Sequence, residues 1–545
     1  MKKSKKLAIK VVSLALAVLS GLSLVGCGLG KTEQVGSNSE KVLDIYLFNA
    51  GYGTDWVYAL KDGFMNQEWV KSKYGDDLTV NITYNDLTTY ATDHIKNGDS
   101  IDLYFGMNLR ELYTEDYQRK PVCEDLTDLF DKTVPGTDIK LKDKLIPTMY
   151  DSCSFTDDRG NKKIYSLPWA SSMTGIYYNH DLLKECGIDV PLTTEQLIKA
   201  CDVVSEKQGF AVMASSTYAA YWAYLYSTFW AQYAGADEYN KYLEGKVGDD
   251  YAVDSKTLVE SQPAMLKSLQ ELDKILKGKH MVDTANSMLF MTAQTNFLKG
   301  QGAFMACGDW FESEMKKEKE DRIAAGQSLP EISMMKTPII SSIVEKLEYR
   351  DGNAYMSDEK LAALIKDVDA GKETPTDTSV SQSDYDIVRK ARGIVYSPGP
   401  GHNAIIPSYT PAKELAKDFL LYMSTSDAYA TFFNKTEGAQ LPFMYDAEKV
   451  CGDIYTKASD TAKIRNELYN NENEKFRANI LPYEGSFPLV MYSGLGLLPG
   501  NTLTFEVFFG SQGSDYISPD KLYEDAKKCW DKKRWTKMLE DAMLI

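Results

Sequence analysis

Short apolar runs alternate with helical segments from residue 42 onward, and this alternation constrains the fold more than any other feature. Three of the runs, Val42 to Phe48, Leu78 to Ile82 and Ile101 to Phe105, have the length and composition of buried strands. Segments with a helical spacing of apolar residues lie between them. Strands that alternate with helices are typical of a parallel or mixed sheet with helices on its faces, so we predict an α/β fold.

The alternation restarts beyond residue 165, which indicates a second lobe. Thr174 to Asn179 predicts another strand, and Thr193 with Gln196 has the spacing of a capping box at the start of a helix. The 545 residues also exceed what one hydrophobic core usually serves, so we expect at least two lobes. Ligands of such sheets bind beyond the carboxyl ends of strands, which points to the loops 49–56 and 106–110.

Residues 1–26 have the pattern of an export signal, which would not be part of the fold. Lysines precede an uncharged run from Val11 to Gly26 that is too short to span a bilayer. The run ends in Leu24-Val25-Gly26-Cys27, which resembles the lipobox of bacterial lipoproteins. The resemblance implies cleavage after Gly26 and a lipid anchor on Cys27. A plain secretory signal is the alternative, and it would keep export but lose the anchor.

Composition narrows the ligand class. The chain has 61 basic and 78 acidic residues, a net charge of −17, and this surface disfavours nucleic acid as a partner. Aromatic residues make up 12% of the chain, with 35 Tyr and 8 Trp. Flat amphipathic side chains suit ligands with apolar faces and polar rims, and sugars are such ligands.

Residues 27–40, rich in Gly, Ser, Asn and charge, are expected to form a flexible tether.

Metal and cofactor chemistry have little support in the sequence. The four histidines form no zinc-type pair, and the seven cysteines other than Cys27 share no metal-like spacing, so we expect neither a metal nor a cofactor. No P-loop, His-Glu-x-x-His or Gly-x-Ser-x-Gly motif occurs, and we predict that the protein is not an enzyme. The charged segment 312–383 is predicted to be a largely solvent-exposed insertion.

Several segments in order resemble the family of extracellular solute-binding proteins that deliver carbohydrates to ABC importers. The run Phe297 to Trp310 matches the family's Phe-x-x-Gly…Gly-x-Trp pattern, with one residue more between Ala and Met. The other matching segments are Pro168, Tyr178-Asn179-His180-Asp181-Leu182, Gly187-Ile188-Asp189-Val190-Pro191, Thr194-Glu195-Gln196-Leu197, Ala416-Lys417-Asp418-Phe419-Leu420, Gly438 to Pro442 and the Asp102-to-Arg110 loop.

The resemblance implies a two-lobed clamshell of the type II-like periplasmic-binding-protein class, each lobe a mixed sheet flanked by helices. The chain would cross between lobes near residues 167–171, 400–404 and 481–487. Lobe 1 would then comprise 41–167 plus 404–482, and lobe 2 would comprise 168–403 plus 483–545. A sugar would lie in the cleft between the lobes.

The resemblance also implies which residues contact that sugar. Trp310 matches a tryptophan that commonly stacks on a sugar ring, and Asn108 with Arg110 stands where relatives carry a polar pair. Position in the chain and side-chain type add six further candidates for contact with the ligand. They are Tyr52, Trp56, Trp169, Tyr221, Trp222 and Asp309. Core packing is the competing interpretation for each tryptophan, and for the helix 218–233, which is aromatic all round.

We therefore predict a monomeric binding protein, anchored by Cys27 to the outer face of the cell membrane, that passes a carbohydrate to ABC permease subunits. Gly28 is not the aspartate-type retention signal of two-membrane bacteria, which favours a Gram-positive host. Alternatives are a binder of peptide or polyamine with the same fold, a sensor lipoprotein, or a surface glycoside hydrolase. The last would need two carboxylates about 5–10 Å apart in the cleft.

Overall fold

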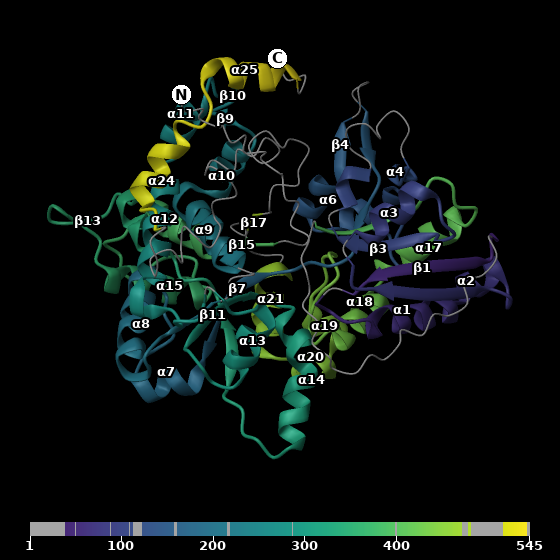
Figure 1. The fold of residues 1–545 in the computed structure, drawn as a ribbon, viewed down its shortest axis with the longest axis horizontal. Helices are drawn as coiled ribbons and strands as arrows, with labels where there is room; N and C mark the ends of the chain where they lie inside the picture. Colours follow the sequence, from purple (N-terminus) through teal and green to yellow (C-terminus); the bar gives the residue numbers. More distant parts are fainter. Residues whose placement is uncertain are drawn as a thin grey trace, which may run out of the picture.

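The computed structural model describes residues 39–49, 51–87, 89–107, 109–112, 122–156, 161–214, 219–285, 287–397, 401–470, 478–480 and 516–541. Two α/β bodies lie side by side, each built around its own sheet (Figure 1). The predicted export signal, Cys27 and most of the tether lie outside the described residues. No helix within the described ranges has the length and apolar character needed to cross a membrane.

The first lobe is a five-stranded mixed sheet in the order β2-β1-β3-β16-β6. Its strands are β1 (Val42–Phe48), β2 (Thr79–Asn85), β3 (Leu103–Met107), β6 (Leu167–Pro168) and β16 (His402–Ile405). β1 pairs in parallel with β2 and β3, whereas β16 is antiparallel to β3 and β6. β1 is buried along nearly its whole length, as expected for a parallel strand covered by helices on both faces.

Segments far apart in sequence cover this sheet, and Figure 1 shows α18 beside α1. Their contacts join α1 to α18 and to α17. The helices of the first lobe are α1 (Asp55–Asn66), α2 (Glu68–Tyr74), α3 (Tyr90–Asn97), η1 (Leu109–Leu112), α4 (Thr127–Phe130), α5 (Leu141–Lys144), α6 (Pro147–Cys153), α17 (Lys413–Met423), α18 (Ser426–Lys435), α19 (Ala447–Cys451) and α20 (Asp453–Thr456), with a hairpin of β4 (Ser154–Thr156) and β5 (Lys162–Ile164).

The second lobe is a four-stranded sheet in the order β12-β7-β11-β8. Its strands are β7 (Thr174–Asn179), β8 (Val212–Met213), β11 (Phe304–Gly308) and β12 (Ile332–Met335). β7 is antiparallel to both β11 and β12, and β8 is parallel to β11. Smaller pairs are β9 (Lys246–Val247) with β10 (Asp250–Tyr251), β13 (Arg350–Asp351) with β14 (Ala354–Tyr355), and β15 (Ile394–Tyr396) with β17 (Ala478–Ile480).

Helix α8 of the second lobe begins with a side-chain cap that the sequence encodes. Thr193 Oγ1 accepts a hydrogen bond from Gln196 N, and Gln196 Oε1 accepts one from Leu192 N, so the residues of the predicted capping box act as caps. The helices are α7 (His180–Cys186), α8 (Thr194–Gln208), α9 (Ala219–Ala234), α10 (Ala236–Leu243), α11 (Ser255–Glu260), α12 (Pro263–Ile275), η3 (Gly278–His280), α13 (Phe290–Leu298), α14 (Phe311–Ala324), η4 (Ser341–Lys346), α15 (Asp358–Asp369), α16 (Gln382–Arg392), α21 (Asp460–Asn470), α24 (Pro519–Ala526) and α25 (Lys532–Asp541).

Helix α21 lies in the range that the sequence assigns to lobe 1, but it packs against β12 of the second sheet. Lys336, which follows β12, forms an ion pair with Glu467 at 2.5 Å, and Leu468 belongs to a core cluster with Tyr177 of β7. On this packing we propose that the third crossing between lobes precedes α21 rather than lying at 481–487.

The segment 312–383, expected to be a largely solvent-exposed insertion, has many exposed residues but also contributes to the sheet and the core of the second lobe. Its strand β12 forms an edge of the second sheet, and its apolar residues enter the main core of that lobe. The buried residues in this core are Met335, Ile339, Ile340, Ile343, Leu347, Met356, Leu361, Leu364, Ile365 and Val380. The charges lie on the outer faces of helices such as α15, so a charge-rich segment still contributes one apolar face.

Ile365→Ala tests this structural role. Ile365 has no exposed surface, so its truncation should lower the free energy of unfolding of the second lobe by about 2–5 kcal/mol. The matched control, Lys366→Ala on the exposed face of the same helix, should change it by no more than about 0.5 kcal/mol. Denaturant titration followed by circular dichroism measures both, and equal small effects would contradict the core assignment.

Candidate functional site

The two lobes meet through the loops that follow β1 and β11. Tyr52, from the first loop, reaches across to the second lobe, and its hydroxyl donates to Asp309 Oδ1 at 3.1 Å. The same hydroxyl lies 2.9 Å from Ser172 Oγ in the segment that joins the sheets. Both loops leave the carboxyl ends of their strands, where ligands of α/β sheets bind. The predicted residues Tyr52 and Asp309 are therefore brought together at the seam.

Asp309 is a buried carboxylate held by several partners. It forms an ion pair with Arg465 of α21, and its backbone N–H donates to Met173 O at 2.9 Å. Burial raises the pKa of Asp309, while the Arg465 guanidinium and the Tyr52 hydrogen bond oppose that rise. Burial also raises the pKa of Tyr52 well above its usual value. Asp309 is thus a structural anchor of the seam, with little surface for a sugar hydroxyl.

Trp310 stands beside Asp309 and lies against the first lobe. A methyl group at Gly51 would come within 2.8 Å of Trp310 Cβ, so only glycine fits this approach. Trp310 is half-buried and packs against the cores of both lobes. The structure therefore places the predicted stacking tryptophan at the boundary between lobes.

Trp310 is one end of a row of aromatic rings. Its ring centroid lies 5.6 Å from that of Tyr221, which lies 5.9 Å from that of Tyr224. Tyr224 in turn stacks on Tyr396 at 4.8 Å with an interplanar angle of 21°. Trp310, Tyr221 and Tyr224 are partly exposed, whereas Tyr396 is buried. The row runs from the β11 loop along α9 to the strand β15.

Three predicted tryptophans lie in cores instead of on a cleft surface. Trp56 and Trp169 are fully buried and stack on each other at 5.2 Å, and the Trp169 indole N–H donates to Gly106 O at 3.1 Å. Trp222 is 1% exposed and donates to Met213 O at 3.3 Å. With no free face in this conformation, none of them supports the predicted stacking role. Core packing, the competing interpretation, describes their surroundings.

The polar pair predicted in the β3 loop is only partly described. Arg110 belongs to the short helix η1, directly beyond β3. Asn108 lies outside the described residues. Sugar contacts by these two residues stay a prediction.

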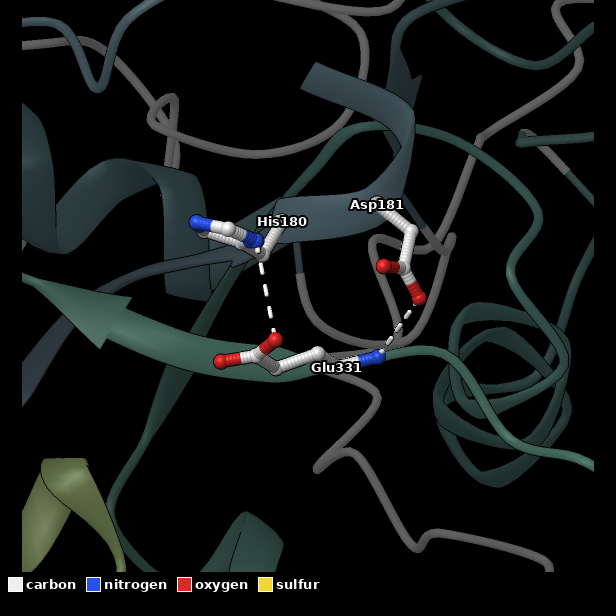
Figure 2. Close-up of side chains that lie close together, drawn as sticks. All are labelled: His180, Asp181 and Glu331. Atoms are coloured by element: carbon white, nitrogen blue, oxygen red, sulfur yellow. Dashed lines mark hydrogen bonds and ion pairs between the residues drawn. The ribbon is translucent and has the colours of Figure 1, made fainter. Parts of the chain in front are cut away.

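A second cluster of polar side chains consists of His180, Asp181 and Glu331 (Figure 2). His180 and Asp181 start α7, Glu331 precedes β12, and their donor atoms lie within 4.8 Å of one another. Asp181 Oδ2 accepts from Glu331 N at 3.1 Å, and His180 N donates to Glu331 O at 2.9 Å. The amino end of a helix favours anions over cations, and the carboxylates are exposed. We interpret the cluster as a hydrogen-bonded junction that ties β12 to α7.

Sequence reasoning missed several residues of the seam. Arg465 belongs to no motif, and nothing in the sequence around it indicates contact with Asp309. Tyr224 belongs to the aromatic-rich helix 218–233, where its helical spacing from Tyr221 is a signal that could have grouped the two, whereas Tyr396 ends a short apolar run with no such signal.

Comparison with known proteins agrees with this architecture. Residues 50–430 match the family model described as bacterial extracellular solute-binding protein, so the chain belongs to that family. It has the two-lobed α/β fold of these proteins, as the resemblance implied.

Individual relatives are distant. A probable secreted solute-binding lipoprotein from Streptomyces coelicolor is 16% identical with a TM-score of 0.55, over 90% of this chain and 99% of that one. The GacH receptor of Streptomyces glaucescens, solved unliganded and with acarbose, is 14% identical with a TM-score of 0.54, over 92% and 98%. A multiple sugar-binding protein of Streptococcus mutans is 38% identical over 48 residues, 9% of this chain and 11% of that protein.

Gly51→Ala tests whether the loop contact controls the approach of the lobes. Gly51 does not have a left-handed backbone conformation, so the only expected cost is the clash of the new methyl with Trp310. Such overpacking costs about 1–3 kcal/mol, so the variant should favour a more open molecule. Small-angle scattering should report a larger radius of gyration, while far-UV circular dichroism stays unchanged. An unchanged radius would show that the contact does not limit closure.

Proposed function

We propose that this protein captures an oligosaccharide between its lobes and delivers it to the permease of an ABC importer. The observation that carries the proposal is the row of Trp310, Tyr221, Tyr224 and Tyr396 beside the seam. Aromatic faces suit the apolar faces of pyranose rings, and Trp310, Tyr221 and Tyr224 are partly exposed. Three partly exposed rings in a row, with buried Tyr396 packed against Tyr224, fit a chain of sugars better than a single sugar.

Family and relatives support the same ligand class. The family consists of extracellular solute-binding proteins, and the names of two distant relatives refer to multiple sugars and to acarbose. Binding in a seam between lobes couples capture to closure, because a ligand that contacts both lobes favours the closed arrangement. The protein itself needs no catalytic step for this role.

Trp310→Ala tests the ligand site. Wild-type protein is titrated by calorimetry with a panel of mono- and oligosaccharides, and at least one oligosaccharide should bind. Removing the indole takes away a buried contact of about 1.5–3 kcal/mol, which corresponds to roughly 10- to 150-fold weaker binding. Tyr355→Ala, on the exposed β13–β14 hairpin, is the control and should leave the affinity unchanged. A protein that binds no sugar of the panel would overturn the proposal.

We further propose that Cys27 carries a lipid that holds the protein at the outer face of the membrane of a Gram-positive cell. A tether of 27–40 would allow a reach of roughly 20 Å, which keeps the lobes near the permease. Two acyl chains suffice for stable anchoring, whereas one does not.

Cys27→Ala tests the anchor. Without the lipidated thiol, the protein should appear in the culture medium instead of the membrane fraction. Cell fractionation with immunoblotting measures this, and calorimetry on the released protein should give the wild-type sugar affinity. Retention of the variant in the membrane fraction would contradict lipid anchoring. Cys529→Ala, which leaves the signal region intact, is the control and should remain with the membrane.

A further inference from the structure

Glu314 lies directly beneath the contact between lobes. It occupies the first turn of α14, and its backbone N–H donates to Trp310 O at 2.9 Å. Its side chain is largely buried, and Oε2 accepts a hydrogen bond from Gln294 Nε2 of α13 at 2.7 Å. Its other oxygen, Oε1, faces the first lobe, 3.2 Å from where a Cβ on Gly51 would stand. The first-lobe loop therefore covers this carboxyl group.

The charged groups around Glu314 have other partners. Asp309 pairs with Arg465, and Lys316 of the same helix pairs with Glu437 of the first lobe at 2.6 Å. Cys307 of β11 faces Glu314, and burial together with the Glu314 charge raises the pKa of its thiol. Among the described residues, no cation lies within ion-pair distance of Glu314. Its one polar side-chain partner there is a neutral amide.

A carboxylate in such a place is costly when ionised. Burial raises the pKa of Glu314 to about 7, with the Gln294 hydrogen bond acting in the opposite direction. Separation of the lobes would remove the Gly51 loop from above the carboxyl and let water reach it. Its pKa would then return toward that of an ordinary glutamate, about 4.3.

We propose that Glu314 is a positioning residue whose protonation is coupled to closure of the lobes, so that closing takes up a proton. The inference rests on the proposed capture of a ligand by closure. A group whose pKa is higher in the closed form favours closure when it is protonated. The closed form therefore loses stability relative to the open form as pH rises from about 5 to about 7, and the difference levels off above pH 8.

Ligand affinity should follow the same profile. A shift from about 4.3 to about 7 is the upper limit, and partial access of water reduces it, so the expected loss between pH 5 and pH 8 is roughly 10- to 100-fold. With this profile, the protein would bind its ligand most tightly in an acidified medium.

A second carboxyl group on the same helix, that of Glu312, could also titrate, and its effect must be distinguished from that of Glu314. Glu312 accepts from Thr461 Oγ1 at 3.1 Å, and burial raises its pKa while Lys319 lowers it. Unlike Glu314, it has a nearby ammonium group, and it faces α21 in place of the Gly51 loop.

The test compares Glu314→Gln with Glu312→Gln and with Glu320→Gln, which lies on the exposed face of α14. Raffinose and maltotriose serve as calorimetric probes from pH 5 to pH 8. Wild type, Glu312→Gln and Glu320→Gln should lose affinity across this range. Glu314→Gln, which keeps an acceptor for Gln294, should bind with nearly the same affinity at every pH and match the wild type at pH 5.

Scattering without sugar provides a readout independent of the ligand. The radius of gyration of the wild type should increase between pH 5 and pH 8, and that of Glu314→Gln should not. The inference would be overturned if the wild type and Glu314→Gln showed the same dependence on pH. It would also be overturned if Glu312→Gln abolished the pH dependence and Glu314→Gln did not. Failure of both sugars to bind at any pH, with the pH-dependent radius intact, would count against the choice of ligand and not against Glu314. Thermal melting confirms that each variant is folded.

Discussion

The buried ion pair of Asp309 with Arg465 is the interaction on which the seam depends. Asp309 is 4% exposed and Arg465 has no exposed surface, so each charge would be strongly destabilised without the other. Removing one partner of such a pair typically costs about 3–5 kcal/mol, because the remaining charge stays buried. The pair joins the end of β11 to α21, and Tyr52 extends the hydrogen bonding into the first lobe. Trp310 and the start of α14 come directly after Asp309 in the chain.

Much of the fold could be predicted because its signals are local. The alternation of strands and helices marked β1, β2, β3 and β7, and the spacing of Thr193 and Gln196 marked the start of α8. The order of the family motifs implied a fold of two lobes. The family match and the two separate sheets agree with that fold. The spacing of apolar residues along a helix or strand is the same whichever lobe the element joins, so these elements can be predicted without knowing their neighbours.

The site could be predicted only in part, because burial is decided by distant residues. Trp56 follows a strand in the same way as a cleft residue would, yet Trp169 and Phe432 enclose it from more than 100 residues away. The same limit applies to Arg465, whose partner Asp309 is 156 positions earlier. Trp310 could be recognised because it belongs to a family motif, whereas Tyr224 and Tyr396, in the same row of rings, belong to none.

Helix α14 shows why a charged sequence can be an interface. Read alone, Glu312 to Arg322 resembles a solvated surface, and its even mixture of charges shows no apolar face beyond Phe311 and Met315. Its first turns nevertheless meet the opposite lobe through polar groups: Ser313 Oγ donates to Thr436 O at 2.9 Å, and Lys316 pairs with Glu437. Polar contacts are more easily exchanged for water than an apolar face. An interface of this kind suits the proposed capture by closure, because it can separate and re-form more easily than a fused hydrophobic core.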